Sequence, residues 1–417
     1  MSFRHGPAAL LAVFAMCAAL PSAATAREGV LAFAAPVESA FLRVVVTDGT
    51  GRTVSGPPEF RDEDASLVAV PIAGSSTGPY RISWRAMSRD GDVVRGGAAV
   101  AATAALGEGV RAEPDIRPLV IAERLLRLMS PVILLGLAVA RFWVVGKGGG
   151  DTVDHAGWWR AWWCATGAGL LGLLLAPIAQ LRALGAGAGD ITSLLGDTRW
   201  GASWIIQGAA LALAGASAAT LGRGSSTPFR AASVIAGPAL ALGAIAWSGH
   251  ASTGGDRAIG IGADVLHGWA TATWLGGLVG VFVLVVPALR GLGDEARTRL
   301  AAPIVVRFST LAVSAVAVLV VTGVYRALAE LSSLSDLVDT AYGRALAVKL
   351  GVFALMLGVG AYNRFVIHPR LERAALGLDP TDRGAALALR RSVGAELMLA
   401  AVVIVTVSVL VTLPPPT

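Results

Sequence analysis

The sequence carries little charge for its length. Asp, Glu, Lys and Arg make up 15% of the 417 residues, against about 25% in a typical soluble domain. Hydrophobic residues make up 55%, which excludes an ordinary soluble globular protein and indicates a membrane protein. The formal net charge of +6 does not predict a nucleic-acid partner, because the arginines mostly flank apolar runs, where they orient membrane helices.

Cysteine is nearly absent, with only Cys17 and Cys164 in the chain. Residues 1–26 have the pattern of a secretory signal peptide, with an apolar core and the small-x-small sequence Ala24-Thr25-Ala26. Cleavage after Ala26 would remove Cys17, so we expect no internal disulfide in the mature chain. No glycine-rich motif that would cradle the phosphates of ATP is present either. Transport would therefore be passive, exchange-driven or coupled to a gradient.

Long apolar runs dominate the second part of the sequence. Runs of about 20 residues predict a membrane all-α bundle of eight transmembrane helices. They cover approximately residues 120–145, 161–183, 201–222, 231–249, 262–289, 304–326, 343–366 and 393–413.

The region ahead of them, residues 27–105, has the residue pattern of a small all-β domain. Strand-like runs occur at Phe41–Thr47, Leu67–Ile72 and Tyr80–Trp84, with turn signals at Asp48-Gly49 and Asp90-Gly91. An immunoglobulin-like β-sandwich is the natural fold for these short strands. We thus predict a signal peptide (1–26), a sandwich (27–105), a linker (106–118) and a transmembrane domain (119–417).

Basic residues predict the orientation of the helices. If the signal peptide exports the β domain, the connections on the cytoplasmic side hold fifteen Lys and Arg residues and those on the outer side hold five. This bias follows the positive-inside rule. The β domain, the C-terminus and the stretch Ser248–Leu278 are then expected on the outer face.

The stretch Ser248–Leu278 places several ionisable side chains close together between two apolar runs. It contains His250 and His267, two of the five histidines, and Asp264. Asp264, His267, Thr271 and Trp274 recur at helical spacing, so they share one helix face that could turn toward His250. Imidazole and carboxylate groups suit a borderline metal ion such as Cu(II) or Zn(II). The pattern leaves a second interpretation open, in which these residues cap helix ends and lie in the wet interface.

Further polar or soft side chains lie within the predicted spans. Lys349 could extend to the outer surface, and Glu396 could pair with an arginine such as Arg391; either could also relay protons or ions. Thioethers of Met129, Met356 and Met398 could offer ligands to Cu(I) along a pathway, although membrane methionines also serve simple packing.

Several of these motifs resemble the copper-resistance protein D (CopD) family. They are Ser248-Gly-His-Ala251, Asp264-Val-Leu-His267, Trp274-Leu-Gly-Gly-Leu278, Gly343–Lys349, Gly360-Ala-Tyr-Asn-Arg364 and Arg391–Glu396. The exported region is similar to a CopC-type copper-binding sandwich, on Pro36-Val-Glu38, Val46–Arg52, Gly78–Trp84 and Ser88–Asp92. The resemblance implies copper handling, with copper ion, Cu(I) or Cu(II), as the ligand.

The exported region departs from the CopC pattern. Copper sites of that type use an N-terminal histidine and an Asp-Gly-His turn, whereas here cleavage would expose Arg27 and the turn reads Asp90-Gly91-Asp92. We therefore expect that this domain has lost the family's site and is structural or receives a partner.

The resemblance and the spacing together predict a copper transporter of the bacterial inner membrane, not an enzyme. Uptake would start at His250, His267 and Asp264, with Trp274, Lys349, Glu396 and the three methionines on a pathway. Expected partners are the lipid bilayer, copper ions and a periplasmic copper-carrying protein. Two alternatives remain open: a b-type cytochrome with haem between two histidines, and a copper sensor or assembly protein that does not transport.

Overall fold

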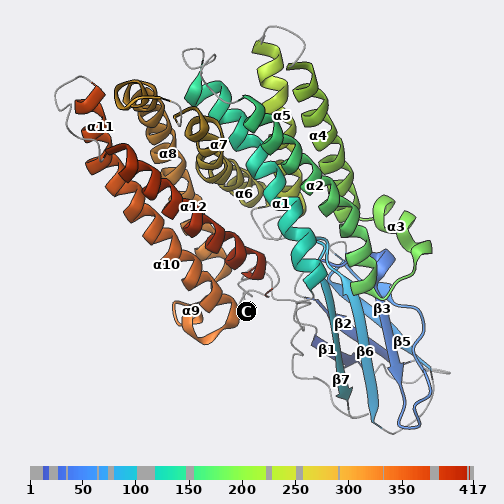
Figure 1. The fold of residues 1–417 in the computed structure, drawn as a ribbon. Helices are drawn as coiled ribbons and strands as arrows, with labels where there is room; N and C mark the ends of the chain where they lie inside the picture. The colour runs from blue at the N-terminus through green and yellow to red at the C-terminus, as the bar shows by residue number, and fades with distance from the viewer. Residues whose placement is uncertain are drawn as a thin grey trace.

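The fold is taken from a computed structural model of the chain. It describes residues 13–17, 27–33, 36–62, 65–73, 79–100, 118–146, 155–221, 228–249, 257–289, 292–331, 333–375, 385–410 and 413. A β domain lies at one end of a helical bundle (Figure 1). That end is called the domain end below.

Two antiparallel sheets form the β domain. One has the strand order β1-β2-β5-β4 and the other β3-β6-β7. Within the described residues, the strands are β1 Val13–Cys17, β2 Arg27–Ala32, β3 Arg43–Thr47, β4 Glu59–Phe60, β5 Leu67–Ile72, β6 Tyr80–Met87 and β7 Val93–Val100.

Alternating apolar residues place the core of this domain between the sheets. Side chains of Val68 and Val70 on β5 meet those of Val46 on β3 and Ile82 on β6, all fully buried. In β6 the burial alternates along the strand as the sequence predicts. The three strand runs expected from sequence correspond to β3, β5 and β6, and the predicted all-β domain is confirmed.

Strand β1 belongs to the segment predicted to be a signal peptide. Val13–Cys17 pairs antiparallel with β2, from Val13 opposite Ala32 to Cys17 opposite Glu28. Cleavage after Ala26 remains a prediction. It would remove β1 and leave β2 as the edge of its sheet.

The helices form the rest of the described chain. They are α1 Pro118–Val139, α2 His155–Leu184, α3 Ile191–Gly196, α4 Arg199–Leu221, α5 Pro228–Ser248, α6 Arg257–Thr271, α7 Gly277–Leu289, α8 Asp294–Glu330, α9 Asp336–Asp339, α10 Ala341–Tyr362, α11 His368–Ala375 and α12 Ala385–Leu410. Three π-helical segments continue the helices that precede them: η2 Ala140–Val145, η6 Ala272–Gly276 and η7 Asn363–Ile367.

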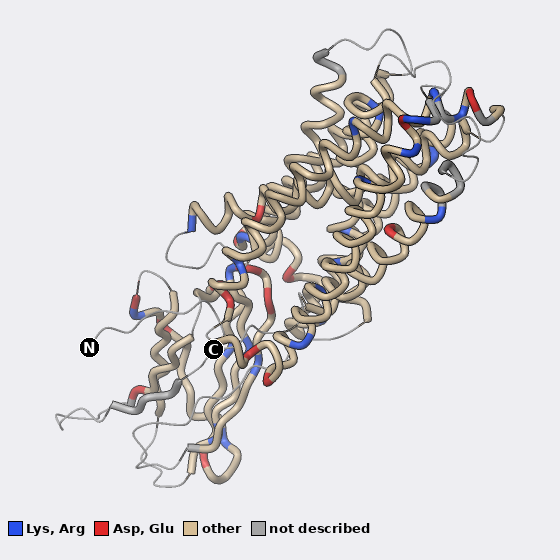
Figure 2. Tube along the Cα trace, turned by 90° about the vertical axis from the view of Figure 1, so that its left-hand side faces the viewer, with Lys and Arg blue, Asp and Glu red and all other residues tan. Residues whose placement is uncertain are grey.

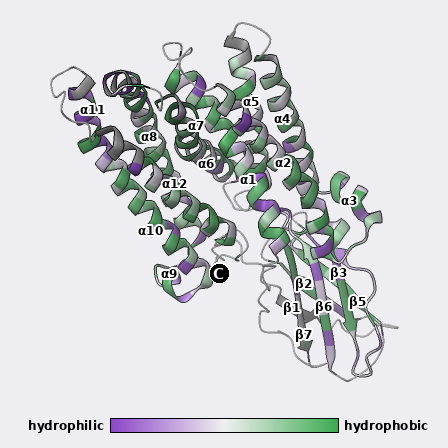
Figure 3. Cartoon of the chain, viewed as in Figure 1, coloured by the Kyte–Doolittle hydropathy of each residue, from purple (hydrophilic) through white to green (hydrophobic). Residues whose placement is uncertain are grey.

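Within the described residues, eight helical segments are long and apolar enough to cross a membrane, as the sequence predicts. Hydrophobic residues run along them (Figure 3). Many large ones are exposed, among them Leu174, Val321 and Leu355. An apolar exterior of this kind suits contact with lipid acyl chains. Lys and Arg gather at the end of the bundle opposite the β domain (Figure 2), in agreement with the bias read from sequence.

A close glycine contact joins α1 to η6. A Cβ atom placed on Gly136 would lie 2.0 Å from the backbone carbon of Gly276. Small residues allow this approach of two helix backbones, which is a common way to pack membrane helices. The contact fixes the segment that carries Trp274 against α1.

The β domain docks onto the bundle through the turn Ser88–Asp92. The Gln180 side-chain amide on α2 donates to the Gly91 carbonyl oxygen at 2.6 Å, and Arg124 on α1 contacts the Asp92 carboxylate at 2.8 Å. Met87 is fully buried and packs with Leu184 and Trp200 of the bundle. This interface explains why polar residues such as Arg124 occur in the first turns of an apolar helix.

Candidate functional site: polar clusters between α6, α8, α10 and α12

The first polar cluster lies at the domain end, between α6 and α8. Asp264 Oδ1 is 3.0 Å from Nη1 of Arg326, and His267 Nδ1 is 2.9 Å from the Thr322 hydroxyl. Asp264 and His267 lie one turn apart on α6, as predicted, and the face they share packs against α8. Arginine and threonine on α8 therefore complete the surroundings of the predicted ligands.

The hydrogen bonds of Thr322 assign the tautomer of His267. The Thr322 hydroxyl donates to the Val318 carbonyl oxygen at 2.7 Å, so its lone pair is left to accept from His267 Nδ1. With the proton on Nδ1, the lone pair of Nε2 is available for a metal ion. Histidine ligands usually have their second nitrogen fixed in this way.

Further charges surround the cluster. Arg326 also contacts Glu330 at 2.9 Å, and the Tyr342 hydroxyl on α10 donates to Glu330. Lys349, half-buried on α10, is close enough to interact electrostatically with Arg326 and His267. Sequence analysis identified Lys349 but missed Arg326 and Glu330, although their spacing of four residues near the end of an apolar run was a usable signal.

His250 lies outside the described residues. The residue before it, Gly249, directly follows the end of α5 at Ser248, and a Cβ atom placed on Gly249 would be 3.9 Å from Asp264 Oδ2. The end of α5 thus adjoins the Asp264 carboxylate. Among the described residues, no group of three or more His, Cys, Asp or Glu side chains could hold a metal ion. Whether His250 completes such a group stays a prediction.

Toward the middle of the bundle, Trp274 and Met356, two of the residues predicted to line a pathway, are buried together. Met356 is 1% exposed and packs in one apolar cluster with Trp274 and Ala400. The Trp274 ring meets the Phe353 ring edge to face at 5.8 Å. Lys349, Met356 and Asn363 recur every seven residues, so the helical repeat places Lys349 and Met356 on one side of α10 and Asn363 at the start of η7 on the same side.

A second polar cluster lies toward the opposite end, between η7 and α12. The Glu396 side chain is buried, and its Oε1 accepts from the Asn363 amide at 2.7 Å. Ser392 donates to the Asn363 side-chain carbonyl oxygen. The partner found for Glu396 is therefore an asparagine supplied by a π-helical segment, not the arginine expected from sequence. π-Helical segments are frequent at functional sites.

The other two methionines lie apart from this line of residues. Met398 is 74% exposed on α12, where it would face lipid, so the structure does not join it to an interior pathway. Met129 is half-buried on α1 and packs near Leu242 and Ala272.

In the β domain, the turn that would carry a CopC-type ligand serves the interface. Gly91 and Asp92 bind Gln180 and Arg124 of the bundle. Residues 27–105 contain neither histidine nor cysteine.

A β domain fused to the eight apolar helical segments of the described chain, with buried polar clusters between the helices, defines a multi-pass membrane protein. Three family profiles match the chain: CopC domain over residues 21–99, copper resistance protein D-like N-terminal domain over 114–261, and copper resistance protein D over 302–410.

Two relatives agree with these matches. Copper resistance protein D of Pseudomonas syringae pv. tomato is 32% identical over 230 residues, which span 52% of this chain and 70% of the relative. Copper transport protein CutJ of Bacillus subtilis (strain 168) is 28% identical over 403 residues, which span 92% of this chain and 70% of the relative. The chain belongs to the copper resistance protein D family, with a CopC domain ahead of its membrane region. These are copper resistance and transport proteins, not a family of enzymes.

Proposed function

We propose that the protein carries copper inward across the bacterial inner membrane, binding it first at His250, His267 and Asp264 on the outer face. The observation that carries the proposal is His267, whose Nδ1 is held by Thr322 while Nε2 remains free to bind metal. Asp264 lies one turn away and adjoins the end of α5. Imidazole with carboxylate is a suitable ligand set for Cu(II).

The proposed orientation rests on charge. Basic residues are concentrated at the end opposite the β domain, and cytoplasmic ends of membrane helices carry such an excess. The domain end, with the proposed copper site and the C-terminus, would face the periplasm. A signal peptide over residues 1–26 would export the β domain to that side.

From the outer site, copper would pass between α6, α10 and α12. Lys349 borders the site, Trp274 and Met356 follow in the buried middle, and Asn363 with Glu396 lie beyond them. A thioether suits Cu(I) and a carboxylate suits harder ions, so these groups supply successive weak ligands. Met398 is not included, and Met129 remains a candidate on the side of α1.

Copper would be delivered by a separate periplasmic copper-carrying protein or as the free ion. Residues 27–105 of the β domain contribute no imidazole or thiolate, and the turn at Gly91 and Asp92 is occupied by contacts with the bundle. Its proposed role is structural, as a fixed part of the outer surface.

Replacement of His250 and His267 together by alanine tests the proposal. The double variant should lose copper binding in the purified protein, measured as metal content after dialysis, and copper accumulation in cells. His155→Ala at the opposite end of the bundle is the matched control and should retain both. Unchanged copper binding in the double variant would contradict the site assignment.

Two further variants separate binding from passage. Thr322→Val removes the hydrogen bond to His267 and should weaken copper binding about tenfold. Glu396→Gln keeps an acceptor for Asn363 but removes the charge, so it should slow uptake while binding at the outer face persists. Uptake at the unmodified rate in Glu396→Gln would remove Glu396 from the pathway.

A further inference from the structure

Arg141 lies on η2, at the end of the bundle opposite the β domain, and aromatic rings hold its side chain. The guanidinium carbon is 4.5 Å from the centre of the Trp158 ring and 5.9 Å from that of the Phe142 ring. Trp158 is fully buried, and its indole N–H donates to the Leu137 carbonyl oxygen at 3.0 Å. The rings therefore fix the position of the guanidinium group.

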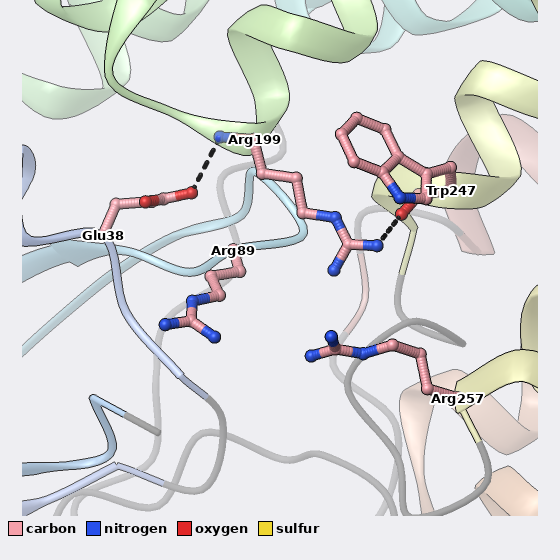
Figure 4. Close-up of a pocket in the computed structure, with 5 residues that line it drawn as sticks. All are labelled: Glu38, Arg89, Arg199, Trp247 and Arg257. Atoms are coloured by element: carbon pink, nitrogen blue, oxygen red, sulfur yellow. Dashed lines mark hydrogen bonds between the residues drawn. The ribbon is translucent and has the colours of Figure 1, made fainter. Parts of the chain in front are cut away.

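The guanidinium of Arg141 has no acceptor among the described residues. Its Nη1 atom is buried without a hydrogen-bond partner, and no described carboxylate interacts with it. Arg199 gives the contrast, because it packs on the Trp247 ring at 4.7 Å in the same way but also donates to the Trp247 carbonyl oxygen (Figure 4). Arg199 further interacts electrostatically with Glu38 and Asp90. Arg141 is half-buried, so a ligand can reach it from the surface of the bundle.

A second arginine borders the same helical turn. Arg307 on α8 is exposed, and its Nη1 donates to the carbonyl oxygen of Val145, at the end of η2, at 3.2 Å. Like Arg141, it forms no ion pair with a carboxylate of the described chain. The indole N–H of Trp162, whose ring stacks on that of Trp158 at 4.9 Å, is buried and also has no hydrogen-bond partner there. The groups at this turn that need a partner are thus donors, two of them on cations.

This turn lies at the depth of lipid headgroups. The spanning segment Pro118–Val145 has 28 residues and is about 42 Å long, whereas the hydrocarbon core of a bilayer is about 30 Å thick. Its ends therefore extend into the headgroup regions. Trp143 and Trp163 are exposed close to Arg141, and exposed tryptophan is enriched at this depth.

We propose that Arg141 and Arg307 bind the phosphate headgroup of an anionic phospholipid from the leaflet at this end of the bundle. Guanidinium groups match phosphate because they donate parallel hydrogen bonds to two oxygens. Two cations without carboxylate partners favour a lipid of net negative charge over a zwitterionic lipid, whose own ammonium group neutralises its phosphate. The exposed rings of Trp143 and Trp163 offer apolar contact to the rest of the lipid. The site is separate from the proposed copper site, which lies at the domain end.

The purified full-length protein provides the test. It is reconstituted with equal amounts of phosphatidylglycerol and phosphatidylcholine, and the lipids that it retains are measured by native mass spectrometry. The unmodified protein should retain phosphatidylglycerol preferentially. Arg141→Gln removes the charge and the paired donors and should lower this preference about tenfold. Arg141→Lys keeps the charge alone and should keep part of the preference.

Two further variants separate the site from folding and from general surface charge. Arg307→Gln changes an exposed side chain and should also lower the preference, which tests the site even if Arg141→Gln does not fold, as thermal unfolding would show. Arg299→Gln is the matched control, because Arg299 is exposed on α8 near the same end but is paired with Glu295; it should retain the preference. Equal retention of both lipids by the unmodified protein, an undiminished preference in folded Arg141→Gln, or an equal loss in Arg299→Gln would overturn the proposal.

Discussion

Arg326 on α8 lies 3.0 Å from the carboxylate of Asp264 on α6 and 2.9 Å from that of Glu330 on its own helix. One guanidinium therefore joins two acidic groups and ties the two helices together at the domain end. Among poorly solvated groups such pairing is required, since an unpaired charge is costly inside a membrane protein. The carboxylate proposed to bind copper is thus neutralised by arginine when no metal is bound.

This arrangement predicts unequal effects of removing its members. Arg326→Ala removes the guanidinium that pairs with both carboxylates and should lower the free energy of unfolding by about 3 kcal/mol or more. Asp264→Ala leaves Arg326 with Glu330 and should cost clearly less. Unfolding in detergent measures both, and the double variant gives the coupling between them. Equal losses in the two single variants would show that Asp264 and Glu330 do not share Arg326.

Docking of the β domain can be tested at Gly91. Its φ is +89°, and a Cβ atom there would lie 2.4 Å from Cδ1 of Trp200, so Gly91→Ala should strain the turn and push it from the bundle. Gly51→Ala is the matched control, because Gly51 has φ +83° with open space around it. Both variants pay about 1–2 kcal/mol for the left-handed backbone. Only Gly91→Ala should raise hydrogen exchange in the end of α2 near Gln180. The same exchange in both variants would contradict the docking contact.

The contact between α1 and η6 predicts that one added methyl group at Gly136 lowers stability strongly. Gly136→Ala should lower the free energy of unfolding by about 1–3 kcal/mol, as overpacking does, because the Cβ atom would collide with Gly276. Gly208→Ala in α4 has no atom within 4 Å of the added Cβ and should leave stability unchanged or slightly higher. Thermal unfolding of the two variants measures their losses of stability. A loss in Gly208→Ala as large as that in Gly136→Ala would contradict the close contact with Gly276 as the cause of the loss.

The hydrogen bonds of Asp48 predict that the β domain becomes less stable in acid. The Thr50 hydroxyl donates a hydrogen bond to Asp48 Oδ1, and this bond is the main reason that the pKa of the Asp48 carboxyl lies below its usual 3.8. Hydrogen bonds from the backbone N–H groups of Arg52 and Thr50 lower the pKa further. A lowered pKa means that the ionised carboxyl stabilises the fold at neutral pH. This stability is lost as the pH falls through the lowered value.

The comparison of Asp48→Asn with the unmodified protein between pH 7 and pH 2 checks this expectation. The variant should be less stable at pH 7 and should lose less on acidification. Thr50→Val, which removes the principal hydrogen bond, should show an intermediate slope. A slope in Asp48→Asn as steep as that of the unmodified protein would contradict the assignment.

Composition and periodicity were sufficient to predict the architecture. The eight apolar runs correspond to eight helical segments of the described chain that are long and apolar enough to cross a membrane, because length and hydropathy decide which segments can cross a bilayer. Strand β7 was missed since Gly96 and Gly97 interrupt its apolar pattern, and Gly96 is required where the Trp84 ring covers the strand.

The site was predictable only in part. Helical spacing placed Asp264 and His267 on one face, but it could not show which helix that face would meet. Arg326 and Thr322 lie more than fifty residues further along the chain, and only tertiary packing brings them to α6. The pairing of Asn363 with Glu396 was also not predictable, because it depends on a π-helical segment for which the local sequence gives no signal.

Helix α1 contacts both the β domain and the interior of the helical bundle. Near its start, Arg124 binds Asp92 of the β domain, and twelve residues later Gly136 lies against the segment that carries Trp274. Twelve residues of α-helix span about 18 Å, and Pro131, buried between the two contacts, lies within that length. α1 therefore gives the β domain a direct mechanical connection to the interior of the bundle without any shared ligand.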